Sequence, residues 1–275
     1  MNAVECAAID EKQKKTAEDA GLRTWSALEY VVLACSATLR QKNSWLIDMR
    51  EVRRHLDQLA QAFPALIEAA QKRYDLALLT GVLRLLAQEE VSIRDLRLIL
   101  EALLDFDYIV ADDASMIVFD ERLTMFPSGD PAAVRDPLAL AAFVRTRMKE
   151  QLSHKLGRGG KTIAVYLLDP KLESALTAGE GAAHDAAREN LLDGLRAEVA
   201  VLETNAAIPA ILTLQRARRT VRQTIVHEFP RVPVISYQEL SLRSNVQPIA
   251  RISPTERSGL PAMSASVVSE HSRKA

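Results

Sequence analysis

The residues that come closest to a known chemical motif are the glycine-rich GRGGKT at positions 157–162. Its last three residues, Gly160-Lys161-Thr162, match the end of a phosphate-binding loop, in which backbone N–H groups and a lysine hold nucleotide phosphates. That motif also needs a glycine five positions before its second glycine, where this chain has Lys155, and it needs a strand before the loop and a helix after it. The flanking residues predict the reverse order. We therefore interpret the segment as a glycine turn between two elements, because glycine adopts positive φ angles without steric cost, and we predict no nucleotide cofactor.

The acidic residues and the histidines give no pattern for a metal or catalytic site. Carboxylates gather at Asp105, Asp107, Asp112 and Asp113, and hard cations such as Ca²⁺ bind carboxylates, but the spacing and the turn glycine of an EF-hand are missing. A solvated acidic loop is favoured. The five histidines lack the spacing of metal ligands, and no serine or cysteine lies in a nucleophile-elbow pattern. We predict a protein that is not an enzyme, without catalytic, cofactor-binding or metal-binding residues; a triad assembled from distant positions stays an alternative.

A basic cluster lies in QRARRTVRQ, within a predicted helix that spans about residues 216–228. It contains Arg216, Arg218, Arg219 and Arg222. Residues four apart share a helix face, so Arg218 and Arg222 lie together. The cluster could bind phosphate or an acidic partner, or it could be a solvated face or a protein contact. No aromatic residues interleave with the arginines as a stacking platform, so nucleic acid is not expected.

The bulk composition favours a folded protein without a strong electrostatic field. The chain has 275 residues, of which 48% are hydrophobic, and its 35 basic and 36 acidic residues give a net charge of -1. A basic field that attracts nucleic acid or acidic membranes is therefore missing. Cys6 and Cys35, the only cysteines, are too few for a disulfide framework, so we expect a reducing cytoplasm. No apolar run approaches the roughly 20 residues that span a bilayer, and we expect the chain alone to be soluble.

Helical periodicity dominates the first half of the chain. Apolar residues at three- and four-residue spacing predict four helices, in about 25–46, 48–63, 75–86 and 92–103. In the first of these helices, the apolar stripe formed by Leu28, Val31, Val32, Cys35 and Leu39 is expected to face inward. Asp48 with Glu51, and Ser92 with Asp95, match the capping box of a helix start. Short links between the helices predict a compact helical subdomain.

The second half of the chain changes to an α/β pattern. A helix is predicted over 137–156, and the strand-like TIAVYLL follows the glycine turn. The run PAILTL, the arginine-rich helix and VPVIS then predict a strand–helix–strand crossover, and VQPIARI a last strand. The predicted class is mixed α and β and predominantly helical. Its parts are a mobile leader (1–23), a helix (24–47), a helical subdomain (48–105), an acidic loop (106–136), a small α/β subdomain (137–252) and a disordered tail (253–275).

Four stretches of the sequence resemble one known family. MREVRRHLDQLAQAFPALIEAA and LLTGVLRLLAQEEVSIRDLRLILEALLDF are similar to the helical third subdomain of the type III secretion and flagellar export-gate family. FVRTRMKEQLSHKL with IAVYLLDPKLESAL resembles the start of its fourth subdomain, and VPVISYQEL a later element. The resemblance extends over about residues 25–253 and leans to the injectisome branch. The segment 24–47 resembles only the end of the first subdomain.

The resemblance implies an inner-membrane protein whose cytoplasmic parts form a nonameric ring and receive chaperone–substrate complexes for export. Other proteins of the secretion apparatus are then the expected partners, without nucleic acid or a small-molecule substrate. The membrane domain, most of the first subdomain and the second subdomain have no counterpart here, so we expect a truncated or split cytoplasmic fragment that is mostly monomeric by itself. In the VSIRDLR signature, Arg94, Arg97 and Glu101 are the residues free for a partner contact. The alternative is a stand-alone binding protein that uses the helix at 215–228 for an acidic partner.

Overall fold

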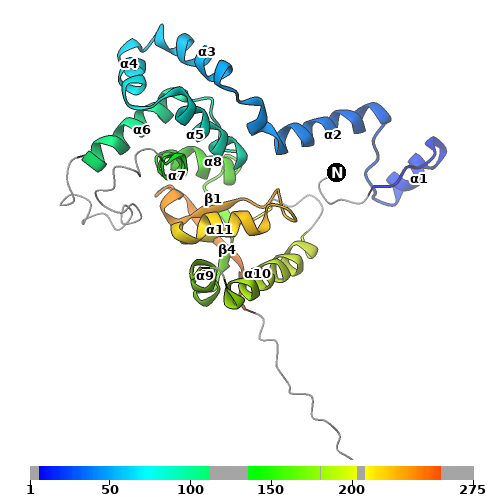
Figure 1. The fold of residues 1–275 in the computed structure, drawn as a ribbon. Helices are drawn as coiled ribbons and strands as arrows, with labels where there is room; N and C mark the ends of the chain where they lie inside the picture. The colour runs from blue at the N-terminus through cyan, green and yellow to red at the C-terminus, as the bar shows by residue number, and fades with distance from the viewer. Residues whose placement is uncertain (1–5, 112–135, 180, 203–207, 255–275) are drawn as a thin grey trace, which may run out of the picture.

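The computed structural model describes residues 6–111, 136–179, 181–202 and 208–254. A helical part and a small α/β part lie against each other, and an N-terminal helical arm extends away from both (Figure 1). The predicted class, predominantly helical with a small α/β part, is confirmed. The predicted positions of the subdomain boundaries stay predictions. Residues 112–135, which form most of the predicted acidic loop, and 255–275, which form most of the predicted tail, lie outside the described residues.

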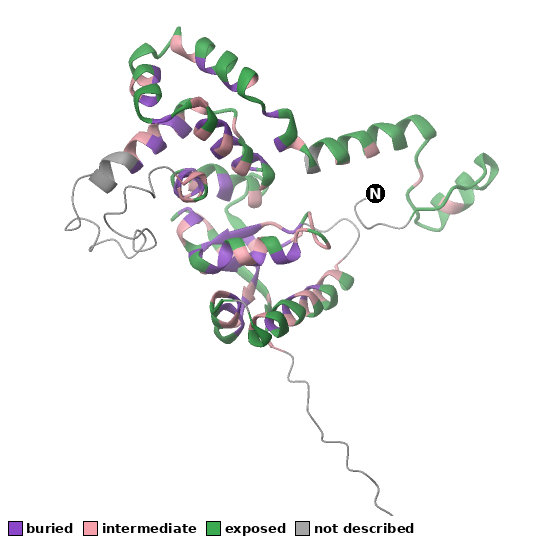
Figure 2. Ribbon diagram, in the orientation of Figure 1, coloured by how far each residue is buried: buried purple, intermediate pink, exposed green. Residues whose placement is uncertain are grey.

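The N-terminal arm is largely exposed as far as Leu39, and it meets the helical part near Ser44, which is buried. It comprises η1 (Glu11–Gln13), α1 (Lys14–Asp19), α2 (Ala27–Gln41) and η2 (Asn43–Leu46). Helix α2 begins at a capping box, because Ser26 Oγ accepts from the Glu29 N–H at 3.3 Å and Glu29 Oε2 accepts from the Ser26 N–H at 2.7 Å. The prediction of an inward-facing apolar stripe on α2 is wrong, because most of this helix is exposed (Figure 2). Leu28 is 75% exposed and Val32 is 56% exposed. No other part of the described structure covers this helix.

The helical part contains six helices where the periodicity predicts four. Its elements are α3 (Met49–Ala60), α4 (Pro64–Arg73), α5 (Leu76–Gln88), α6 (Leu96–Ala111), α7 (Pro137–Arg147) and α8 (Lys149–Leu156). Helix α4 was not predicted; Pro64 begins it instead of only ending the helix before it, because proline fits the first helical position. The single helix predicted over 137–156 is divided at Met148 into α7 and α8. Helix α6 continues through Ala111, into the segment predicted as loop.

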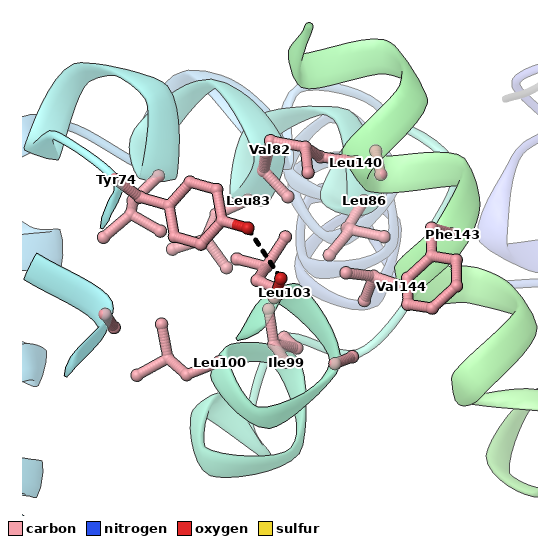
Figure 3. Packing of buried hydrophobic residues seen from close by; sticks show 14 of the residues in the cluster. Tyr74, Val82, Leu83, Leu86, Ile99, Leu100, Leu103, Leu140, Phe143 and Val144 are labelled. Atoms are coloured by element: carbon pink, nitrogen blue, oxygen red, sulfur yellow. Dashed lines mark hydrogen bonds between the residues drawn. The ribbon is translucent and has the colours of Figure 1, made fainter. Parts of the chain in front are cut away.

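One apolar core holds α3 to α8 together. Its fully buried members include Leu86, Leu100 and Val144, which lie on α5, α6 and α7 (Figure 3). The core also encloses Tyr74, whose hydroxyl donates to the Leu103 carbonyl at 2.6 Å, so this buried polar group is satisfied. Helices α7 and α8 contribute to this core, which ties the segment before the sheet to the helical part.

Asp95, and not Ser92, caps helix α6. The helix begins at Leu96, and Asp95 Oδ1 accepts from the Leu98 N–H at 3.1 Å. Ser92 Oγ meets only the Arg94 N–H, at 3.4 Å, outside the helix. The cap predicted at Ser92 is therefore wrong, because the box pattern fits a start three residues too early.

Asp95→Ala is expected to lower the free energy of unfolding by about 1 kcal/mol, the usual cost of losing an N-cap. Ser92→Ala is the matched control and should change it by about 0.5 kcal/mol or less, as for an ordinary surface substitution. Urea unfolding of both variants measures the difference. The reverse ranking would contradict this helix start.

Within the described residues, four strands form one parallel sheet. They are β1 (Thr162–Leu168), β2 (Ala210–Thr213), β3 (Val234–Ser236) and β4 (Asn245–Ile252), in the order β3-β2-β1-β4. Strands β2 and β3 are parallel neighbours joined through α11 (Gln215–Ile225), so the predicted strand–helix–strand crossover is confirmed. Both faces of the central strands are buried, as is usual for parallel sheets.

Helices cover one face of the sheet, and α8 and η5 approach the other. Helices α9 (Pro170–Thr177), α10 (Ala182–Ala200) and α11 share a core with Tyr166 and Ile211. On the opposite face, Val165 and Leu212 pack with partly buried residues from α8 and from the chain after η5 (Tyr237–Glu239). This second face therefore lies toward the helical part.

The glycine-rich segment is a turn from helix α8 into strand β1, as predicted. Arg158 and Gly159 have φ angles of 51° and 83° there. A Cβ atom at Gly157 would lie 2.5 Å from the Gly160 carbonyl oxygen, so the tight turn requires glycine. The order helix, turn, strand is opposite to that of a phosphate-binding loop.

Candidate functional site

The three signature residues predicted for partner contact lie at the surface. Arg94, Arg97 and Glu101 are not buried, and Arg97 Nε donates to Glu101 Oε1 at 2.7 Å. This hydrogen bond raises the pKa of the Arg97 guanidinium. The same guanidinium lies over the Phe63 ring, 4.7 Å from its centroid, which is a cation–π contact. Arg97 and Glu101 therefore partly satisfy each other, and whether they contact a partner stays a prediction.

The arginine-rich helix α11 has two kinds of arginine. Arg216 and Arg219 are exposed, whereas Arg218 is only 5% exposed and Arg222 is half-buried. Arg222 donates to the carbonyls of Val232 and Pro230 at 2.9 and 3.2 Å, and burial lowers its pKa. The interpretation of all four as one solvated face is wrong for Arg218 and Arg222. The period of the helix turns them inward, because Arg218 and Arg222 share the face of buried Val221 and Ile225.

Arg218 belongs to a buried network of two arginines and two glutamates. Arg145 on α7 holds Glu239 with two hydrogen bonds, from Nε to Oε1 at 2.7 Å and from Nη2 to Oε2 at 2.9 Å. Arg145 Nη1 also lies 3.1 Å from Glu89 Oε2. Arg218 donates to both oxygens of Glu89, and its Nε lies 3.4 Å from Glu239 Oε1. Each guanidinium therefore contacts both carboxylates.

The electrostatics of the network favour the charged forms. Arg145 and Glu239 have side chains that are 5% and 0% exposed. Burial alone would raise the pKa of Glu89, but the Arg145 and Arg218 guanidiniums outweigh it and the pKa is lowered. For Arg145, the loss of water would lower the pKa, and the Glu239 carboxylate raises it above its usual value. The four charges balance, so the network is suited to hold elements together and not to bind a charged ligand.

The network joins the two parts of the molecule. Glu89 follows α5 of the helical part, Arg145 lies on α7, Arg218 on α11, and Glu239 in η5 after strand β3. Sequence reasoning missed Glu89, Arg145 and Glu239 as a group. One signal was present: Arg145 lies four residues after buried Ala141, on the same face of α7, and an arginine on a buried face needs a carboxylate partner.

The described residues contain neither a metal-binding cluster nor a membrane-spanning helix. No group of three or more histidine, cysteine or acidic side chains there could hold a metal ion. Of the helices described, none has the length and apolar character needed to cross a membrane.

Solved structures of the Chlamydia pneumoniae CdsV protein have a similar fold. The Chlamydia pneumoniae CdsV protein aligns with a TM-score of 0.66 and 30% identity over 88% of this chain and 65% of that chain. In the structure of the C. pneumoniae CdsV and CdsO protein complex, the match has a TM-score of 0.69 and 28% identity, covering 89% of this chain and 67% of that chain.

The chain belongs to the FHIPEP family, whose model matches residues 1–245. Among curated relatives, the Low calcium response locus protein D of Yersinia pestis is 26% identical over 243 residues. That match covers 86% of this chain and 31% of the relative, so the chain spans about a third of the length of the curated proteins it matches.

Proposed function

We propose that the chain is a non-enzymatic interaction module of a bacterial type III secretion export apparatus, acting at the cytoplasmic side of the inner membrane. The family match over residues 1–245 carries this proposal. The expected partners are other apparatus proteins and chaperone–substrate complexes. The CdsV relative forms a complex with CdsO. The first partner to test is therefore the counterpart of CdsO in the bacterium that encodes this chain.

The exposed arm supports a role in protein contacts. Helix α2 carries apolar side chains around its circumference, and these are at least a third exposed: Leu28, Tyr30, Val31, Val32, Leu33 and Leu39. A helix that is apolar on all sides is usually buried, so α2 has the surface of an element covered by another polypeptide segment.

The charged residues also support binding over catalysis. The ionisable groups around Arg145 and Glu239 form ion pairs with one another, so they are engaged within the fold and do not face a substrate. The alternative of a stand-alone protein that binds an acidic partner through all four arginines of α11 is weakened, because Arg218 and Arg222 make contacts within the fold.

Expression of the 275-residue chain in a bacterium with an intact export gate is expected to reduce secretion partially, because the chain would compete for neighbours of the gate. In a strain that lacks the gate, it should not restore secretion, because it spans only 31% of the length of the full relative. The measurement is the amount of secreted substrate in the medium.

A variant with Leu28→Ser and Val32→Ser provides the matched control. Both side chains are exposed, so the variant should fold, and it should lose the inhibition if α2 contacts the apparatus. Restored secretion in the deletion strain, or no inhibition by the folded chain, would contradict the proposed function.

A further inference from the structure

A solvent-open cleft lies between α9, α10 and α11, the three helices that share a core with one face of the sheet. Its volume is about 610 Å³. Its lining is mainly polar and basic, and comes from Leu176, Thr177, Gly179, His184, Arg188, Arg216, Thr220, Gln223 and Thr224. This cleft is separate from the buried network of Arg145 and Glu239.

Two guanidiniums of the lining have no partner. Within the described residues, the side chains of Arg188 on α10 and Arg216 on α11 make no hydrogen bond or ion pair. Other arginines of the same two helices are paired: Arg196 donates to Glu228 and Asp193, and Arg218 to Glu89. Arg188 and Arg216 are thus free to meet an anion from outside.

The remaining lining residues suit an anionic peptide. His184 Nδ1 lies 3.8 Å from Asp185 Oδ1, and no acidic residue is among the described lining residues. Thr220 and Gln223 have no side-chain partner in the described structure and can donate to carboxylate or backbone oxygens. Leu176 and Thr224 are buried and form a floor. Arginine recognises carboxylates through paired N–H donors, which gives such a site its selectivity.

We propose that this cleft binds a short acidic segment of a partner protein, with carboxylates on Arg188 and Arg216. The arginines are exposed at the rim, so an occupant would stay partly in solvent, as a peptide segment does and an enclosed small ligand does not. Among the described residues, the lining contains no Phe, Tyr or Trp side chain on which a nucleic-acid base could stack. The site goes beyond the proposed function, because it requires only an acidic segment and not a particular apparatus.

The test uses the full chain and a fluorescein-labelled hexaglutamate peptide, with binding followed by fluorescence anisotropy. The variant with Arg188→Gln and Arg216→Gln should weaken binding about tenfold or more, as for loss of two charge-assisted contacts. Thr220→Trp should weaken it similarly by filling the cleft while keeping the charge. The matched control is Arg219→Gln, an exposed arginine of the same helix outside the lining, which should bind within about twofold of the unchanged chain.

Several results would overturn the site. They are absence of binding by the unchanged chain, an equal loss with Arg219→Gln, or full binding by Thr220→Trp. Pyrophosphate that competes more tightly than the peptide would show a small-anion site instead. None of these results depends on secretion. A negative peptide-binding result would therefore not contradict the proposed role in export, and a negative secretion result would not contradict the proposed cleft.

Discussion

Arg145→Ala is expected to lower the free energy of unfolding by about 3–5 kcal/mol, the usual cost of breaking a buried ion pair from one side. The arginine donates two hydrogen bonds to Glu239, whose side chain is fully buried, and it also faces Glu89. Its removal leaves a buried carboxylate with only the more distant Arg218 Nε at 3.4 Å and the Ser236 N–H at 3.1 Å. The free energy of unfolding in urea at neutral pH measures the loss.

Arg147→Ala is the matched control, two residues along the same helix. Arg147 pairs with Asp105, but both side chains are about half exposed, so its loss should cost about 1 kcal/mol or less. Neutral pH is the right condition because the pKa of Glu89 is lowered on folding. Its contribution is present above the pKa of an unfolded glutamate, about 4.3, and is lost as the pH falls toward the lower folded value. Equal losses for the two variants would contradict the buried network.

Replacing both partners tests whether the cost is that of an unpaired charge. Arg145→Met with Glu239→Leu removes the pair without leaving Glu239 behind, and apolar residues of similar size often substitute for buried ion pairs without loss. The double variant should therefore be more stable than Arg145→Ala. A double variant that is less stable would show that the network acts through other contacts of Glu239.

The local structure could be predicted from the sequence because its signals lie within a few residues. Asp48 accepts a hydrogen bond from the N-terminus of α3, as its position in the sequence indicates. The four runs predicted as strands, TIAVYLL, PAILTL, VPVIS and VQPIARI, correspond to the four parallel strands of the sheet. The glycine turn could be separated from a phosphate loop by the order of the flanking elements alone.

The ion-pair network could not be predicted in this way. Arg145 and Glu239 are 94 positions apart, and Arg218 and Glu89 are 129 apart. Only the packing of the helical part against the α/β part brings these groups together. The cleft with Arg188 and Arg216 has the same origin, since its two arginines come from separate helices.

Burial of an apolar helix face also depends on what covers it, and the sequence does not show this. The apolar spacing of Leu28, Val31 and Val32 on α2 is as regular as that of Ile99, Leu100 and Leu103 on α6. The second stripe is 0–1% exposed, whereas Leu28 is 75% exposed. Periodicity gives the direction of a face, and only the tertiary structure gives its partner.

Leu100→Ala is accordingly expected to lower the free energy of unfolding by about 2–5 kcal/mol, because it leaves a cavity in a close-packed core. Leu100 is 0% exposed and lies in the apolar core that holds α3 to α8 together (Figure 3). Leu28→Ala makes the same chemical change on α2, where no described residue would lose a packed neighbour, and should cost about 0.5 kcal/mol or less. Urea unfolding of the 275-residue chain at low concentration compares them. If Leu28→Ala lowers the free energy of unfolding of the monomer as much as Leu100→Ala does, then α2 is buried against the rest of the chain. That result would contradict the proposal that α2 is a surface for another polypeptide.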